Sequence, residues 1–148
     1  MISKTEEYAL KAVVFLARQG DERPCTVQEI ARGTGIPANY LSKILHRLGQ
    51  HGVAVSERGR HGGFRLSHAP EAVALAEVIA PFGSPADRHR CLLGRRECSD
   101  ENPCGAHEQW KRVRATTSEF FAETSIADVI GGGADRDPTP TNRSEKTE

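Results

Sequence analysis

The sequence predicts a mainly α-helical protein with a small β wing, in which a winged helix-turn-helix domain precedes one long helix. Three observations lead to this prediction. Residues 1–50 show helical apolar spacing interrupted by glycine and proline breaks. Residues 53–66 hold two short β-prone runs around a glycine-rich turn, and residues 103–123 form a single long amphipathic stretch. The order helix, helix, turn, helix, hairpin is typical of a winged helix.

Capping residues and apolar spacing predict the first three helices. Small and branched apolar residues recur at helical spacing over 5–18, and Thr5 is placed to cap this helix. Thr26 and Glu29 form a Thr-x-x-Glu capping box for a short second helix. A third helix is expected to open at Pro37, since proline suits the first helical turn. Its core-facing stripe consists of Leu41, Ile44, Leu45 and Leu48.

The polar face of the third helix and the hairpin tip are the candidate DNA-binding surfaces. Asn, Ser and Lys can hydrogen-bond base edges, whereas Lys and Arg hold phosphates. The strands 53–57 and 63–66 are joined by a cationic turn that can enter a minor groove or hold the backbone. An ordinary solvated helix face is the alternative. The candidate DNA-binding residues are Asn39, Tyr40, Ser42, Lys43, His46, Arg47, Arg58, Arg60, His61 and Arg65.

Charge is unevenly distributed along the 148 residues, although the formal net charge is zero. Residues 1–68 carry ten Lys/Arg against six Asp/Glu, whereas residues 69–148 carry ten against fourteen. The basic half can meet phosphate. The N-terminus lacks the pattern of a signal peptide, and no apolar run approaches the roughly 20 residues that span a bilayer. We therefore expect a cytoplasmic protein without membrane contact, in a reducing compartment where clustered cysteines act as ligands.

A cluster of soft donors lies at the start of the long helix, which is expected to open at Pro103 and so to place Cys104 in its first turn. Cys91, Cys98 and Cys104 are followed by His107, a set that suits zinc or an iron–sulfur cluster. Gaps of six and five residues are loose for zinc, whose sites usually use tighter Cys-x2-4-Cys pairs, so an iron–sulfur cluster is favoured and zinc stays as the alternative. Cys25 lies far away and is interpreted as a loop thiol. No Cys-x-x-Cys pair supports a thiol-redox enzyme, and we expect no catalytic residues.

Four further segments stand beside the three-cysteine loop that comes before the long helix. They are Glu7-Tyr-Ala-Leu10, Thr26-Val-Gln-Glu-Ile-Ala31, Ile36-Pro-Ala-Asn-Tyr-Leu41 and Arg58-Gly-Arg-His-Gly-Gly-Phe-Arg-Leu66. Together with the loop, these segments resemble the Rrf2 family of winged-helix transcriptional regulators, which includes iron–sulfur regulators of the IscR and NsrR types. The resemblance covers about residues 1–130, and the three-cysteine loop is its most specific part.

The resemblance implies a homodimeric regulator, usually a repressor, whose long helix crosses its copy in the second subunit. Two winged helices would meet the half-sites of an imperfect palindrome in double-stranded DNA. The cluster would sense redox, nitric oxide or iron status and control DNA affinity. A zinc-stabilised winged-helix DNA-binding or protein-interaction module without a sensing cluster is the alternative.

The resemblance leaves two candidates for the fourth ligand of the cluster. Cys104-Gly-Ala-His107 resembles the Cys-x-x-His arrangement that completes a two-iron cluster in IscR-type proteins. Glu7 falls where NsrR-type proteins supply an N-terminal carboxylate across the dimer. The first two cysteines are separated by six residues, one more than in the usual family pattern. We favour His107 and a two-iron cluster, with Glu7 and a four-iron cluster left open.

The predicted organisation has four parts. Residues 1–82 form the winged helix-turn-helix domain and residues 83–104 the cluster-binding loop. Residues 105–130 form the dimerisation helix and its end, and residues 131–148 a disordered tail, as their three glycines, prolines and scattered charges suggest.

Overall fold

The computed structural model describes residues 2–83, 90–95 and 98–131, and its fold class is the one predicted. The predicted tail covers residues 131–148. Gly131 is the last residue of the final helix, and the rest of the tail lies outside the described residues. The elements are α1 (Lys4–Gln19), α2 (Val27–Thr34), α3 (Ala38–Gln50), β1 (Ala54–Glu57), β2 (Gly63–Leu66), the 3-10 turn η1 (Pro70–Ala72), α4 (Leu75–Ile79), α6 (His107–Glu123) and α7 (Ile126–Gly131). Below, residues 2–83 are called the winged-helix domain, and the described residues from 90 to 123 are called the arm.

The first helix is capped by a residue other than the predicted Thr5. The Ser3 hydroxyl accepts the Glu6 backbone N–H at 3.3 Å, and the Glu6 carboxylate accepts the Ser3 N–H at 2.6 Å. This capping box starts α1 at Lys4. The Thr5 hydroxyl instead lies 2.7 Å from the Tyr40 hydroxyl and ties α1 to α3.

The second and third helices follow the prediction closely. Thr26 and Glu29 form the expected capping box, so α2 begins at Val27. Pro37 is the N-cap of α3, one position outside the helix. The apolar stripe of α3 is buried throughout and joins α1 and α2 in one core. These contacts fix which face of α3 is left for solvent.

The wing is a two-stranded antiparallel hairpin with a third segment bound to its edge. Ala54 pairs with Leu66, and Glu57 pairs with Gly63. The backbone N–H of Cys25 donates to the Phe64 carbonyl at 2.8 Å, and the Cys25 carbonyl accepts from the backbone N–H of Phe64 at 2.7 Å. Cys25 is therefore a free thiol, as predicted, but it is buried at the edge of the wing with 4 % exposure instead of lying in an open loop, and burial raises the pKa of its thiol.

A glycine is required where this edge segment crosses the wing. Gly63 has a φ of +154°, and a Cβ there would lie 2.4 Å from the Cys25 carbonyl oxygen. Only glycine permits this approach of backbone to backbone.

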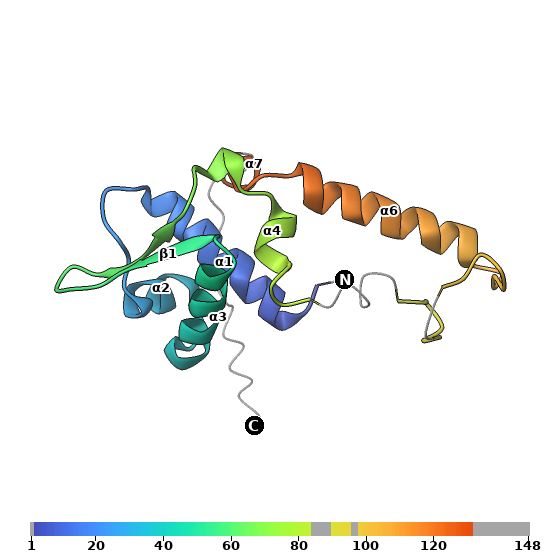
Figure 1. Ribbon diagram of the computed structural model, residues 1–148, viewed down its shortest axis with the longest axis horizontal. Helices are drawn as coiled ribbons and strands as arrows, with labels where there is room; N and C mark the ends of the chain where they lie inside the picture. Colours follow the sequence, from blue (N-terminus) through green and yellow to red (C-terminus); the bar gives the residue numbers. More distant parts are fainter. Residues whose placement is uncertain (1, 84–89, 96–97, 132–148) are drawn as a thin grey trace, which may run out of the picture.

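The arm projects from the winged-helix domain, as Figure 1 shows for α6 in orange. The long helix begins at His107 rather than at the predicted Pro103, because residues 103–106 form an irregular segment and a turn. Its other end returns to the winged-helix domain. Ile126 donates to the Val73 carbonyl at 2.8 Å and is fully buried, so α7 belongs to the core packed on α1. The cysteine loop thus sits at one end of α6, and the other end is anchored.

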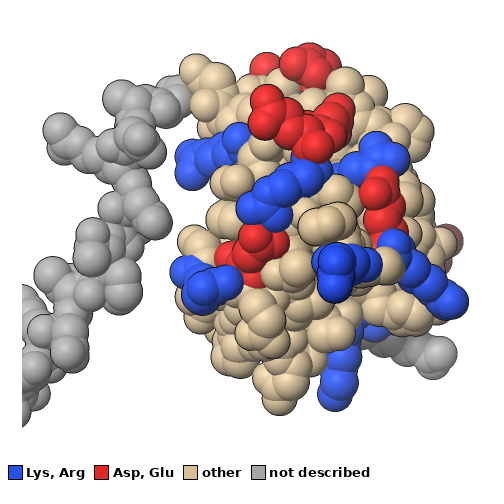
Figure 2. Space-filling view, turned by 90° about the vertical axis from the view of Figure 1, so that its left-hand side faces the viewer, with Lys and Arg blue, Asp and Glu red and all other residues tan. Residues whose placement is uncertain are grey.

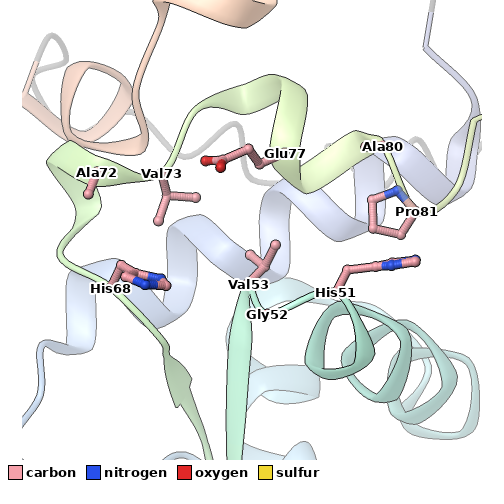
Figure 3. Close-up of a pocket in the computed structure, with 9 residues that line it drawn as sticks. All are labelled: His51, Gly52, Val53, His68, Ala72, Val73, Glu77, Ala80 and Pro81. Atoms are coloured by element: carbon pink, nitrogen blue, oxygen red, sulfur yellow. The ribbon is translucent and has the colours of Figure 1, made fainter.

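The segment after the wing forms two short helical pieces, η1 and α4, with Val73 extended between them. Between α4, η1 and the start of the wing lies a cavity of about 560 Å³ (Figure 3). His68 and His51 lie on either side of Val53, and Glu77 extends from α4 toward Val73.

Candidate metal centre and nucleic-acid interface

The cysteine loop brings two of the predicted thiols to the imidazole at the start of α6. Cys98 Sγ lies 3.3 Å from His107 Nδ1, and the Cys98 side chain also hydrogen-bonds Cys91. His107 is 2 % exposed and Cys91 is 6 % exposed, whereas Cys98 is half-buried. Three of the four predicted ligands in this loop therefore lie in a continuous row of side-chain contacts.

Backbone amides favour the anionic form of the first thiol in this row. Hydrogen bonds from the backbone N–H of Leu93, and secondarily of Arg95, hold the pKa of Cys91 below its usual value against the effect of desolvation. The thiolate is the form that binds metals. The turn around Gly94, with φ +71° and a hydrogen bond from Gly94 N–H to the Cys91 carbonyl, wraps the chain around this sulfur.

Cys104 is placed differently from the prediction that it lies in the first helical turn. It precedes α6, and its carbonyl accepts the His107 backbone N–H at 3.0 Å. Cys104 is half-buried and is tied to His107 through this backbone contact. The donor set of three thiols and one imidazole suits an iron–sulfur cluster or zinc.

The second nitrogen of His107 has a partner that the sequence analysis missed. Nε2 lies 2.7 Å from Asp100 Oδ1, and Lys111 Nζ lies 2.8 and 3.1 Å from the two oxygens of Asp100. Lys111 first and His107 second lower the pKa of the Asp100 carboxyl to about 2. Oxygen and nitrogen donors of Asp100, His107 and Glu108 lie within 4.8 Å of one another. The spacing of the cysteines points to the thiols as ligands. It carries no signal for Asp100 or Lys111.

A second contact links the cysteine loop to the start of α6. The Trp110 indole Nε1 donates to the Arg90 carbonyl at 2.9 Å, which ties the residue before Cys91 to the first turn of α6.

Glu7, the alternative fourth ligand, lies on α1 and not on the arm. Its carboxylate pairs with Lys4 at 3.1 Å and with Lys11 at 2.8 Å, and these lysines lower its pKa, Lys11 most strongly. Within one chain, the described contacts bring Glu7 to lysines and not to the cysteine loop.

The predicted reading face of α3 is exposed along its length. Two of its members also make contacts that hold them in place. Tyr40 stacks edge-on against Tyr8 at 5.7 Å between ring centroids and hydrogen-bonds Thr5, while Arg47 lies 5.8 Å from the Phe82 ring centroid. The members that are exposed to solvent are Asn39, Tyr40, Ser42, Lys43, His46 and Arg47.

The cationic side chains of the wing differ in whether they are paired with an acid. Arg58, Arg60 and His61 lie exposed in the β1–β2 turn, whereas Arg65 on β2 forms an ion pair with Glu57 on β1. Figure 2 shows basic groups spread over this end of the molecule with acidic groups between them. The exposed cations at the tip are thus better placed to meet phosphate than Arg65, which is already paired.

Comparison with known proteins identifies the family. The model of the Rrf2 family, described as an iron-dependent transcriptional regulator, matches residues 2–132. The chain belongs to the Rrf2 family. This confirms the resemblance noted in the sequence, and it makes the protein a transcriptional regulator with a DNA-binding winged helix rather than an enzyme.

Individual Rrf2 relatives cover most of this chain. A protein of Aquifex aeolicus described as an HTH-type transcriptional regulator is 36 % identical over 132 residues, which is 88 % of this chain and 91 % of the relative. The HTH-type transcriptional regulator IscR of Yersinia pseudotuberculosis is 28 % identical and covers 93 % of this chain and 86 % of its own length.

Solved structures support the fold. CymR, the global cysteine regulator of B. subtilis, has a TM-score of 0.78 at 24 % identity and covers 90 % of this chain and 98 % of its own. T. potens IscR has a TM-score of 0.72 at 20 % identity, over 89 % of this chain and 87 % of its own. Among the described residues, no helix is long and apolar enough to cross a membrane.

Proposed function

We propose that this Rrf2-family protein is a homodimeric, cytoplasmic repressor whose affinity for an imperfectly palindromic DNA site is controlled by an iron–sulfur cluster. Residues 1–82 bind DNA, residues 83–104 hold the cluster, and residues 105–130 form the dimer. The observation that carries the proposal is the 3.3 Å approach of Cys98 Sγ to His107 Nδ1 at the free end of the arm.

The residues present fit such a group. Cys91, Cys98 and Cys104 would hold it as thiolates and His107 as the fourth ligand. His107 is favoured over Glu7 because it is buried beside Cys98, whereas Glu7 is paired with two lysines. When bound, the cluster supplies reversible redox and ligand-exchange chemistry that oxidants and nitric oxide disturb.

The arm gives a route from this site to DNA. His107 is the first residue of α6, so holding its imidazole against the loop also fixes the start of that helix. The far end of α6 leads into α7, which packs on α1 of the winged-helix domain. Release of Cys98 and His107 from one another therefore changes how α6 is held in the dimer and how far apart the two winged helices lie.

An absorption spectrum with iron and sulfide counts tests the cofactor on protein purified without oxygen. A brown protein with two irons per chain supports the favoured cluster, and a ratio near four supports the larger one. A colourless protein with one zinc per chain supports instead the zinc-stabilised module.

Two cysteine variants test sensing. Cys98→Ala is expected to abolish the visible absorption and to change DNA affinity measured by fluorescence anisotropy, with the circular dichroism of the winged-helix domain unchanged. Cys25→Ala removes a thiol far from the arm and is expected to keep both colour and affinity. Unchanged DNA affinity in colourless Cys98→Ala protein contradicts control by the cluster.

The fourth ligand is tested in the same way. His107→Ala is expected to destabilise the cluster or to change its spectrum, and Glu7→Gln is expected to leave both unchanged. The reverse result assigns the ligand to Glu7 of the partner subunit.

The wing offers a matched pair for DNA binding. Arg58→Gln is expected to weaken binding to all sequences and to reduce the slope of log affinity against log salt by about 1, because one phosphate contact is lost. Arg65→Gln is expected to have a smaller effect, since Glu57 already neutralises Arg65. Equal effects contradict the assignment of the tip as the phosphate contact.

A further inference from the structure

His107 is a buried imidazole with a polar neighbour at each ring nitrogen. Its side chain is 3 % exposed, with Cys98 Sγ 3.3 Å from Nδ1 and Asp100 Oδ1 2.7 Å from Nε2. A buried ring N–H needs an acceptor, because an unsatisfied donor away from water costs free energy. Asp100 supplies that acceptor from the same loop as Cys98.

The identity of these neighbours decides where the proton of a neutral His107 lies. An ionised carboxylate can only accept hydrogen bonds, so the nitrogen that faces Asp100 carries the proton. Nδ1 is then the nitrogen with a free lone pair, and it faces Cys98 Sγ. Protein metal sites repeatedly use this carboxylate–histidine arrangement to set the ring orientation and raise the basicity of the ligating nitrogen.

We propose that Asp100 is a positioning residue that holds the proton of His107 on Nε2 and presents Nδ1, beside the Cys98 sulfur, as the atom that ligates the cluster. The ligation step rests on the function proposed above, whereas the orientation of the ring by Asp100 does not. Lys111 extends the chain of contacts, because its ammonium binds both oxygens of Asp100 and keeps the carboxylate against the ring.

A different role for Asp100, as a direct metal ligand together with His107 and Glu108, fits the geometry less well. These three residues do lie within 4.8 Å of one another. The Lys111 ammonium, however, occupies both carboxylate oxygens of Asp100 at 2.8 and 3.1 Å, where a bound cation would have to sit. The sulfur beside Nδ1 also offers a softer partner than the two exposed carboxylates.

The orientation of the ring is tested on the full chain before iron is added. In ¹⁵N-histidine NMR spectra, the Nε2–H proton of His107 is expected to be visible and slow to exchange in the wild type. In Asp100→Ala it is expected to exchange too fast to be seen. Glu101→Ala, which removes an exposed acid next to Asp100, is the matched control and is expected to match the wild type. A proton on Nδ1 in the wild type, or a signal that survives in Asp100→Ala, overturns the proposal.

The effect on the cluster is tested on iron-loaded protein. Asp100→Ala is expected to lose iron to a chelator about tenfold faster than the wild type, the lower end of the range for such outer partners. Its reduction potential is expected to rise, because a less basic imidazole stabilises the oxidised form less. Lys111→Met is expected to speed iron loss by a smaller amount, because the carboxylate loses the ammonium that keeps it against the ring. Values equal to those of the wild type in Asp100→Ala overturn the proposal.

A double-mutant comparison separates positioning from a general structural role. His107→Cys supplies a fourth thiolate that needs no ring orientation, so Asp100→Ala added to His107→Cys is expected to change neither the potential nor the rate of iron loss. A full effect in that background shows that Asp100 acts independently of His107 and contradicts the proposal. If the chain takes up no iron at all, the proposed function fails, and the NMR result still decides the orientation of His107.

Discussion

The winged-helix domain and the arm bury very different parts of their helices. In α3 four apolar residues are buried, whereas in α6 the one buried residue is His107. Val113 and Phe120 on α6 are more than half exposed, as are Leu92 and Leu93 in the cysteine loop. The winged-helix domain therefore stabilises itself within one chain. The apolar side chains of the arm stay exposed within the chain, and its buried imidazole makes its contacts at the candidate metal centre.

The largest expected effect comes from making the same substitution, leucine to alanine, in each of the two regions. Leu45→Ala in α3 is expected to lower the free energy of unfolding by about 4 kcal/mol, because this fully buried side chain leaves a cavity in the core. Leu93→Ala in the loop, where the side chain is 63 % exposed, is expected to change it by less than about 0.5 kcal/mol. Urea unfolding followed by circular dichroism measures both. Similar losses would show that the arm is packed as tightly as the domain.

A glycine pair sharpens the picture of the wing. Gly63→Ala is expected to cost about 3 kcal/mol, because a Cβ 2.4 Å from the Cys25 carbonyl adds a backbone clash to an unfavourable φ of +154°. Gly20→Ala has a φ of +70° but no atom within 4 Å, so it is expected to cost only about 1 kcal/mol. Thermal unfolding of the two variants measures the difference. Equal costs would show that the edge segment moves freely away from the wing.

The next prediction tests whether the exposed face of α6 meets a second copy of the chain. Phe120, 54 % exposed and packed edge-on against Phe121 at 5.3 Å, is expected to be an interface anchor. Phe120→Ala is expected to weaken self-association by about 2 kcal/mol, roughly 30-fold in dissociation constant, without destabilising the winged-helix domain. Glu119→Ala on the same helix is the control. Sedimentation equilibrium measures both, and an unchanged dimer in Phe120→Ala would place the interface elsewhere.

The winged-helix domain was predictable from sequence because its signals are local. The stripe of α3 and the box of Thr26 and Glu29 need only residues three or four positions apart. Ser3-x-x-Glu6 carried the same signal, and choosing Thr5 as the cap instead was an error that the spacing could have prevented. The short α7 was missed although the Ser125 hydroxyl accepts from the Asp128 N–H at 3.1 Å in the same kind of cap.

The arm was less predictable because its contacts depend on tertiary structure. The cysteine spacing identified the candidate ligands, but Pro103 gave a false helix start, since the turn before His107 follows from how the loop closes. Asp100 and Lys111 are eleven residues apart, and no periodic pattern links them. Their role becomes visible only when the loop places both beside the imidazole.

The smallest expected effect compares two acids, one in each region, whose pKa values are both lowered to about 2. Arg23, with further hydrogen bonds from Thr26, lowers the pKa of Glu29 at the start of α2, as Lys111 lowers that of Asp100 in the arm. A carboxyl with a depressed folded-state pKa contributes stability above its unfolded value of about 4.5, and this contribution is lost as the pH falls toward 2. Glu29→Gln is therefore expected to flatten the acid-induced loss of stability of the winged-helix domain between about pH 4.5 and 2.

Asp100→Asn is the matched change in the arm, and it is expected to leave this acid unfolding curve as in the wild type. Because both carboxylates are still partly exposed to solvent, the shift from Glu29→Gln is expected to be small and to shrink further at high salt. Unfolding midpoints in urea at pH 5, 4 and 3 measure it for each variant. A curve that Asp100→Asn flattens as much as Glu29→Gln would mean that the arm and the winged-helix domain unfold as one cooperative unit, against the separation that their different burial predicts.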